Sequence, residues 1–69
     1  MPITYDPSAS AAYIYIVDRT DAGEAVDTRV TEDGLVLDFD KQGYLLGIEV
    51  LAAERVLRPE TLAAARHPD

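Results

Sequence analysis

Acidic side chains with the spacing of a calcium-binding loop lie in the middle of this 69-residue chain. Asp38, Asp40 and Gln42 alternate with other residues, Gly43 follows, and Glu49 comes six residues later. The spacing is that of a loop in which side-chain oxygens ligate Ca²⁺, except that Gln42 replaces Asp or Asn. Such a loop needs a helix on each side, whereas both flanks here alternate between apolar and polar residues, as strands do. We therefore interpret the segment as a hairpin with a solvated acidic face and expect no metal site.

Groups suited to acid–base or nucleophilic catalysis are poorly placed in the sequence. With 13 acidic residues in 69, close carboxylate pairs arise by chance, and a thin domain has little room for a concave pocket. The single histidine is His67, and Ser8 and Ser10 have no histidine as a neighbour. We expect a protein that is not an enzyme and needs no cofactor. A small-molecule or metal-dependent enzyme, built on Asp38, Asp40 and Glu49, is the least favoured alternative.

Two tyrosines are the candidate binding residues. Both faces of the predicted strand at 11–17 are apolar, because Tyr13, Tyr15 and Val17 alternate with alanine and isoleucine. Two interpretations remain open. The three residues form either a second covered face of the sheet, packed under a helix, or a protein interface, for which tyrosine supplies rigid area and a hydroxyl group.

The charge balance limits the classes of partner. Six basic against 13 acidic residues give a net charge of −7, so few cations are available to neutralise phosphates. We expect no direct binding to nucleic acid or to anionic membranes, and a basic protein is the favoured kind of foreign partner. No run approaches the 18 apolar residues of a membrane-spanning helix, and no basic leader precedes an apolar stretch, which predicts a soluble cytoplasmic protein. The absence of cysteine excludes disulfides and zinc–thiolate sites.

The length and the patterning predict one domain over 1–69, strand-rich at 3–51, helical at 52–66 and frayed at 67–69. A chain of this size buries only about 60% of its unfolded surface, so the core is thin and stability is marginal. A homodimer would compensate for the thin core.

Period-two alternation predicts strands at 3–5, 11–17 and 25–30, with a charged loop at 18–24 and with Asp27 and Arg29 pointing to the same side. The strongest signal is a hairpin over 34–50, whose turn Asp40-Lys41-Gln42-Gly43 suits a type I turn followed by a glycine at positive φ. The register that gathers the large apolar residues on one face pairs Phe39 with Tyr44, Leu37 with Leu46 and Leu35 with Ile48. A slip of one residue would scatter this set over both faces.

After Leu51 the spacing changes to that of a helix. Ala53, Val56 and Leu57 share one helical face, and Glu54 lies four residues before Arg58. Pro59 interrupts the pattern but also suits the first position of a helix, so we expect one broken helix or two short ones. The fold class predicted is α+β: an antiparallel meander of about five strands with a C-terminal helix packed on one face. The predicted core consists of Ile3, Ile14, Ile16, Val26, Leu35, Leu37, Phe39, Leu46, Ile48 and Val50, with Val56 and Leu57 from the helix.

Three segments also carry a family resemblance. They are Ile3-Thr4-Tyr5-Asp6, Ala12-Tyr13-Ile14 and the run from Gly34 to Gly47-Ile48-Glu49-Val50-Leu51. Together they resemble the small prokaryotic domain-of-unknown-function family 2283 over roughly residues 3 to 53. The chain departs from the family pattern at Ser10-Ala11, where members commonly have Asp-Ala, and in the tail beyond Pro59. The resemblance implies a small β-rich domain without an assigned activity, and the occurrence of some relatives beside small toxin-like proteins implies a binding role.

The function predicted is therefore a structural or protein-interaction module that acts as a homodimer. The alternative is an antitoxin-like or regulatory binding protein whose acidic surface masks a basic partner.

Overall fold

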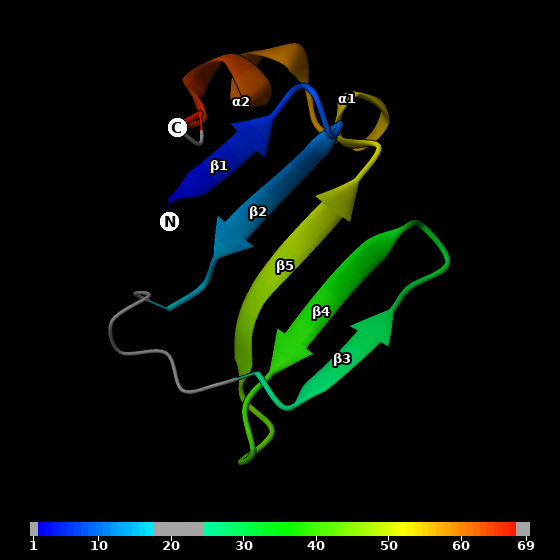
Figure 1. Ribbon diagram of the computed structural model, residues 1–69, viewed down its shortest axis with the longest axis vertical. Helices are drawn as coiled ribbons and strands as arrows, with labels where there is room; N and C mark the ends of the chain where they lie inside the picture. Colours follow the sequence, from blue (N-terminus) through cyan, green and yellow to red (C-terminus); the bar gives the residue numbers. More distant parts are fainter. Residues whose placement is uncertain (1, 18–24, 68–69) are drawn as a thin grey trace.

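The computed structural model describes residues 2–17 and 25–67. The predicted charged loop at 18–24 and residues 68 and 69 of the predicted frayed tail lie outside these ranges. Five strands form a single sheet, and two short helices follow at the end of the sheet where the last strand finishes (Figure 1). Their bounds are β1 (Ile3–Asp6), β2 (Ala11–Tyr15), β3 (Asp27–Val30), β4 (Leu35–Phe39), β5 (Leu45–Leu51), α1 (Ala53–Val56) and α2 (Pro59–Ala64).

All neighbouring strands of the sheet are antiparallel, in the order β1-β2-β5-β4-β3. A β1–β2 hairpin and a β3–β4–β5 meander meet where β2 pairs with β5. The α+β fold class with an antiparallel sheet and helical C-terminal part is confirmed. Pro59 lies at the start of α2, and the helical segment consists of two short helices, as the proline signal allowed.

Two backbone hydrogen bonds and a glycine at positive φ close the β4–β5 turn. In the β4–β5 turn, Gly43 N–H donates to the Asp40 carbonyl at 3.0 Å and Asp40 N–H donates to the Tyr44 carbonyl at 2.9 Å. Gly43 has φ +93°, where a residue with a Cβ is strained. The Asp40 carboxylate also accepts the Gln42 and Tyr44 N–H groups, at 2.9 Å each. This is a type I turn closed by a left-handed glycine, as predicted.

The predicted hairpin register is wrong by two residues. Leu37 lies opposite Ile48 and Leu35 lies opposite Val50, and the register shifts between Asp38 and Phe39. The turn causes the difference, because the Asp40–Tyr44 bonds enclose a three-residue loop with a bulge and leave Phe39 opposite Leu45. At Leu35 and Leu37 the slip of two residues keeps their partners on the predicted apolar face, whereas at Phe39 the bulge makes the shift one residue.

The core lies between one face of the sheet and the helices. Ala12, Val50, Ala53 and Leu62 form its buried cluster. Partly buried side chains pack against this cluster, namely Tyr5, Ile14, Leu35, Ile48 and Leu57.

Part of the predicted core is wrong. Val26 is 61% exposed because it precedes the edge strand β3, Ile16 is 36% exposed because β2 has ended, and Val56 is 43% exposed on α1. Among the predicted core residues, Leu46 and Val50 are buried. The core prediction, which was based on hydrophobicity, selected large side chains and omitted the buried alanines Ala12, Ala53 and Ala65. Their small size lets helix and sheet approach closely.

The two edge strands of the sheet, β1 and β3, differ in whether another segment pairs with them. Beside β1, Tyr5 N–H donates to the Arg66 carbonyl at 2.7 Å and Arg66 N–H donates to the Ile3 carbonyl at 2.9 Å, so the segment after α2 covers this edge. At the opposite edge, all four residues of β3 are exposed. No described helix is both long and apolar enough to cross a membrane.

Candidate functional site

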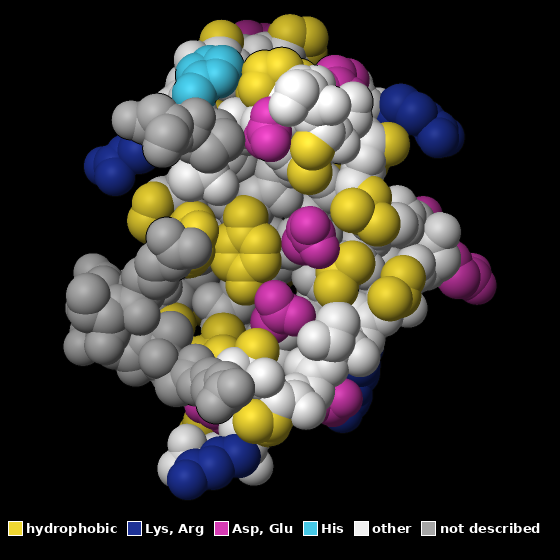
Figure 2. Space-filling model, in the orientation of Figure 1, with side chains coloured by type: hydrophobic (Ala, Val, Ile, Leu, Met, Phe, Trp, Pro, Cys, Tyr) yellow, Lys and Arg dark blue, Asp and Glu magenta, His cyan; other side chains and the backbone are white. Residues whose placement is uncertain are grey.

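The side of the sheet opposite the helices carries the candidate binding residues, and we call it the open face. Because side chains alternate along each strand, the cross-strand pairs place them in rows. One row contains Thr4, Tyr13, Glu49, Val36 and Val30, and the next contains Tyr15, Gly47, Asp38 and Thr28. Figure 2 shows hydrophobic and acidic side chains intermixed over the strands, with Lys and Arg atoms at the margins of the view.

Tyr13 is fixed against a glycine of the neighbouring strand. It projects from β2, and its ring lies over Gly47 of β5, diagonally across the strand pair. A Cβ added at Gly47 would lie only 2.6 Å from the ring carbon Cζ of Tyr13. Position 47 therefore accepts this tyrosine only because it has no side chain.

The Tyr13 hydroxyl takes part in a hydrogen-bond network that spans the sheet. It donates to Asp38 Oδ2 at 2.9 Å, and the Thr28 hydroxyl donates to Asp38 Oδ1 at 3.0 Å. Both carboxylate oxygens of Asp38 are thus occupied by side chains from strands on either side of it in the sheet. Partial burial of Tyr13, followed by its bond to Asp38 and by the charges of Asp38, Tyr15 and Glu49, raises the pKa of Tyr13 to about 12.

The second predicted residue, Tyr15, lies beside Tyr13. Their ring centroids are 4.7 Å apart with the planes inclined at 54°. The helices pack on the Ala12 and Val50 side, so the interpretation that the tyrosines lie under a helix does not hold. Their role as an interface stays a prediction.

Val17 is separated from the tyrosine pair by the end of β2. The N–H groups of Ile16 and Val17 both donate to the Leu46 carbonyl, at 3.0 and 3.3 Å, and this shared acceptor interrupts the strand alternation. Sequence periodicity alone extended the strand two residues too far.

The acidic motif of the sequence is distributed over a hairpin. Asp38 lies in β4 and Glu49 in β5, while the Asp40 carboxylate holds the turn. Within 2–17 and 25–67, no three side chains of the kinds that ligate metals lie close enough together to hold an ion.

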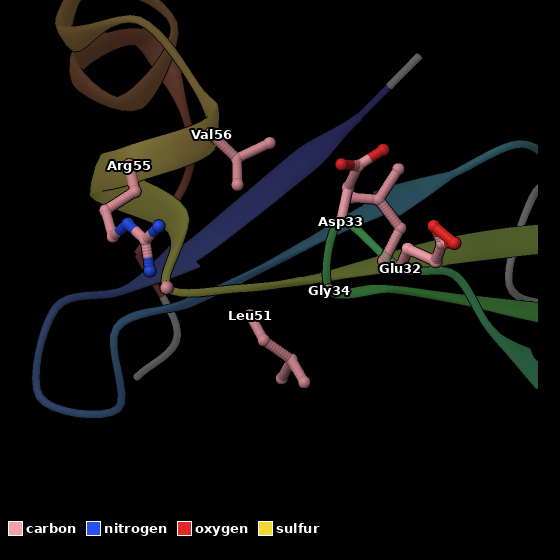
Figure 3. Close-up of a pocket in the computed structure, with 8 residues that line it drawn as sticks. Glu32, Asp33, Gly34, Leu51, Arg55 and Val56 are labelled. Atoms are coloured by element: carbon pink, nitrogen blue, oxygen red, sulfur yellow. The ribbon is translucent and has the colours of Figure 1, made fainter.

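A groove that the sequence did not reveal lies at one end of the sheet. It has a volume of about 660 Å³ and runs between the β3–β4 turn and the start of α1. Glu32 and Asp33 approach it from the turn and Arg55 from the helix, with Leu51 and Val56 between them (Figure 3). Leu51 N–H donates to the Gly34 carbonyl at 3.3 Å, which brings the two segments together. The hairpin was predicted, but its register was not, and the observed register puts these residues side by side.

A third tyrosine joins α1 to the sheet. The Tyr5 hydroxyl donates to Glu54. This bond is the main reason that the pKa of Glu54 lies below its usual value and that of Tyr5 above it. The predicted pairing of Glu54 with Arg58 on one helix is wrong, because the helix ends at Val56 and Arg58 is extended.

Comparison with known protein families gives one match. The model of a family described as a protein of unknown function (DUF2283) matches residues 2–53, which is more than half of the chain. Searches of the curated proteins and of the solved structures found no match.

Proposed function

The chain belongs to the DUF2283 family of small uncharacterised domains, and from this premise we propose that it is a protein-interaction module, that it works as a homodimer and that it has no catalytic activity of its own. The observation that carries the proposal is the open face, a sheet surface that combines two contacting tyrosines with a hydrogen-bonded carboxylate.

Preorganisation of the open face supports a binding role. Gly47 and Asp38 hold the ring and hydroxyl of Tyr13 in place before any partner arrives. A side chain that is already ordered loses little entropy on binding, and tyrosine contributes large contact area with few rotatable bonds. The mixture of apolar and polar groups is also typical of interfaces that form between separately folded proteins.

The same contacts argue against catalysis. With a pKa of about 12, Tyr13 keeps its proton at neutral pH and is neither a base nor a nucleophile there. Asp38 has both oxygens occupied by hydroxyl donors. The network therefore holds both hydroxyl groups and the carboxylate in place and fixes the shape of the surface.

The thin core supports the homodimer. Three of the core positions, Ala12, Ala53 and Ala65, are alanines, which bury little apolar area each. A domain of this size gains stability when a second copy covers part of its surface.

Charge supports a second candidate, in which the open face masks a basic partner. Asp38 and Glu49 lie on this face, and the chain as a whole has a net charge of −7. Opposite charge steers association and makes it depend on salt.

Sedimentation equilibrium from low micromolar to millimolar concentration tests the homodimer. We expect the mean mass to rise from one chain to two. A single-chain mass at every concentration would remove the homodimer from the proposal.

Affinity capture from a native extract tests the open face, with the Tyr15→Ala variant compared with Tyr44→Ala. Tyr44 is 72% exposed in the β4–β5 turn and supplies the matched control. A partner of the open face is lost with Tyr15→Ala and retained with Tyr44→Ala; equal retention contradicts the proposal. For the basic-partner candidate, the captured protein is basic and is released by salt and by Glu49→Gln, whereas salt-insensitive capture excludes it.

A further inference from the structure

The outer edge of β3 is an unpaired strand edge. No other described segment lies beyond it (Figure 1), whereas the β1 edge is covered by Arg66. An uncovered edge presents backbone donors and acceptors that can pair with another chain.

The donors of this edge can be assigned from the β3–β4 pairing. Thr31 N–H donates to the Leu35 carbonyl at 2.8 Å, in register with the pairing of Arg29 with Leu37. Because backbone groups alternate in direction along a strand, the N–H and C=O of Arg29 point toward β4 and those of Thr28 and Val30 point outward. Val26 N–H is used within the chain, since it donates to the Phe39 carbonyl at 3.0 Å.

The side chains along the edge differ between the two faces, with uncharged residues on one and an ion pair on the other. Val26 is 61% exposed and Val30 is 69% exposed, the latter on the open face. On the opposite face Arg29 Nε lies 3.2 Å from Asp27 Oδ2, and the Arg29 guanidinium lies 5.0 Å from the centre of the Phe39 ring.

These residues complement themselves in one register only. An antiparallel pair of β3 strands with Thr28 on the two-fold axis puts Asp27 opposite Arg29 twice. A shift of two residues, which keeps the faces matched, brings either Asp27 opposite Asp27 or Arg29 opposite Arg29. Opposite charges facing each other across strands stabilise a sheet, and like charges destabilise it.

We propose that β3 is a self-association site at which a second copy of this chain adds antiparallel, with Thr28 of each copy exchanging both backbone hydrogen bonds. The inference rests on the homodimer of the proposed function and specifies its interface. The dimer has one continuous sheet, and the two open faces lie side by side on the same surface of it. Because the paired edge is short, the interface belongs to the small class, below roughly 1,200 Å², and the dimer dissociates on dilution.

Charge reversal tests the register. Arg29→Asp puts only acidic side chains across the axis and Asp27→Arg only basic ones, so each variant alone dimerises about tenfold more weakly or worse. An equimolar mixture of the two variants restores the opposite pairs and forms heterodimers, and the double variant D27R/R29D dimerises by itself. Sedimentation velocity measures each case, and circular dichroism confirms folding.

Disulfide formation tests the position of the axis in a chain that has no cysteine of its own. Thr28→Cys places two thiols on residues about 5.5 Å apart between their Cα atoms, a separation that a disulfide spans. Val30→Cys, two residues along the same edge, puts the thiols more than about 10 Å apart, given 3.4 Å per residue. Under mild oxidation we expect covalent dimer from Thr28→Cys and little from Val30→Cys.

The outcomes separate the two proposals. A wild-type chain that stays monomeric overturns both the homodimer and the edge site. A wild-type dimer that persists in Arg29→Asp and Asp27→Arg, or that is crosslinked equally by both cysteine variants, leaves the homodimer standing and overturns the edge site. If one single charge variant fails to fold, the double variant and the crosslinks still decide.

Discussion

The two faces of the sheet are ordered by different interactions, although the same strands form both faces. On the covered face, Ala12 and Val50 are 3% and 1% exposed and pack against the helices. On the open face their sequence neighbours Tyr13 and Glu49 lie opposite each other, and Tyr13, which is only partly buried, is fixed by a glycine and a carboxylate. Removal of apolar area from water stabilises the first face, and directed hydrogen bonds order the second.

The covered face provides the stability of the domain, and the proposed binding role belongs to the open face. A surface whose order does not depend on the core can be altered without unfolding the domain, whereas a core made of small side chains leaves little margin for loss. A domain of this size has roughly 3–10 kcal/mol of total stability, at about 0.05–0.15 kcal/mol per residue. Matched substitutions on the two faces should therefore differ in cost.

The largest effect is expected for Val50→Ala. Removing two methyl groups from the most buried large side chain costs about 2–3 kcal/mol, from lost transfer free energy and from the cavity left behind. The same change at Val36, on the open face, is expected to cost about 1 kcal/mol or less. Urea unfolding of both variants measures the difference, and equal costs would contradict the division between the faces.

The next effect is expected for Gly47→Ala. The new methyl group has no room beneath Tyr13, so the ring must swing away and the bond to Asp38 breaks. We expect a destabilisation of about 1–2 kcal/mol, typical of overpacking at a site where a side chain can move. The pKa of Tyr13 should fall from about 12 toward 10, as read by ultraviolet absorbance titration of tyrosinate. An unchanged titration would show that the ring does not need the glycine.

A smaller effect is expected for Tyr13→Phe, which keeps the ring and removes the hydroxyl. Loss of the bond to Asp38 costs about 1 kcal/mol at neutral pH, and Thr28 still serves the carboxylate. The folded pKa of Tyr13 is raised to about 12 from 10, so in the wild type the unfolded chain releases this proton first and stability falls between pH 10 and 12. Tyr13→Phe should lose less stability over that range. Parallel slopes for wild type and variant would exclude a contribution from Tyr13.

Much of the fold could be predicted from the sequence because its signals are local. Asp40 and Gly43 indicated a turn whose geometry the structure confirms, and Pro59 indicated the start of a helix. The apolar face of the hairpin was predictable even though the register was not, because side chains at alternate positions along a strand point to the same face.

The rest of the site depends on contacts between segments far apart in sequence. Tyr13 and Asp38 are 25 residues apart, and nothing near either of them indicates that Gly47 lies between their strands. The groove beside Arg55 depends on the register of the β4–β5 hairpin, which the sequence predicted wrongly and which brings the β3–β4 turn next to the end of β5. Alternation along one strand reports which residues share a face, and it carries no information on which strand comes next.

The smallest effect is expected at Ala52, where the chain leaves β5 and enters α1. Ala52 has φ +52°, and the next residue, Ala53, donates its N–H at 2.9 Å to the carbonyl of Ser10, which has φ +51°. A left-handed conformation costs a residue with a Cβ about 1–2 kcal/mol, and glycine avoids that cost. Glycine also raises the conformational entropy of the unfolded chain, which lowers stability by about 0.4–1 kcal/mol. Ala52→Gly should therefore stabilise the domain by about 0.5 kcal/mol.

Ala53→Gly, one residue later in a buried helical position, should destabilise it by about 1 kcal/mol or more. Thermal unfolding of the pair tests this contrast. If both substitutions destabilise the domain, contacts of the Ala52 methyl group outweigh the cost of its left-handed conformation. Ala52 would then contribute to the core together with Ala53.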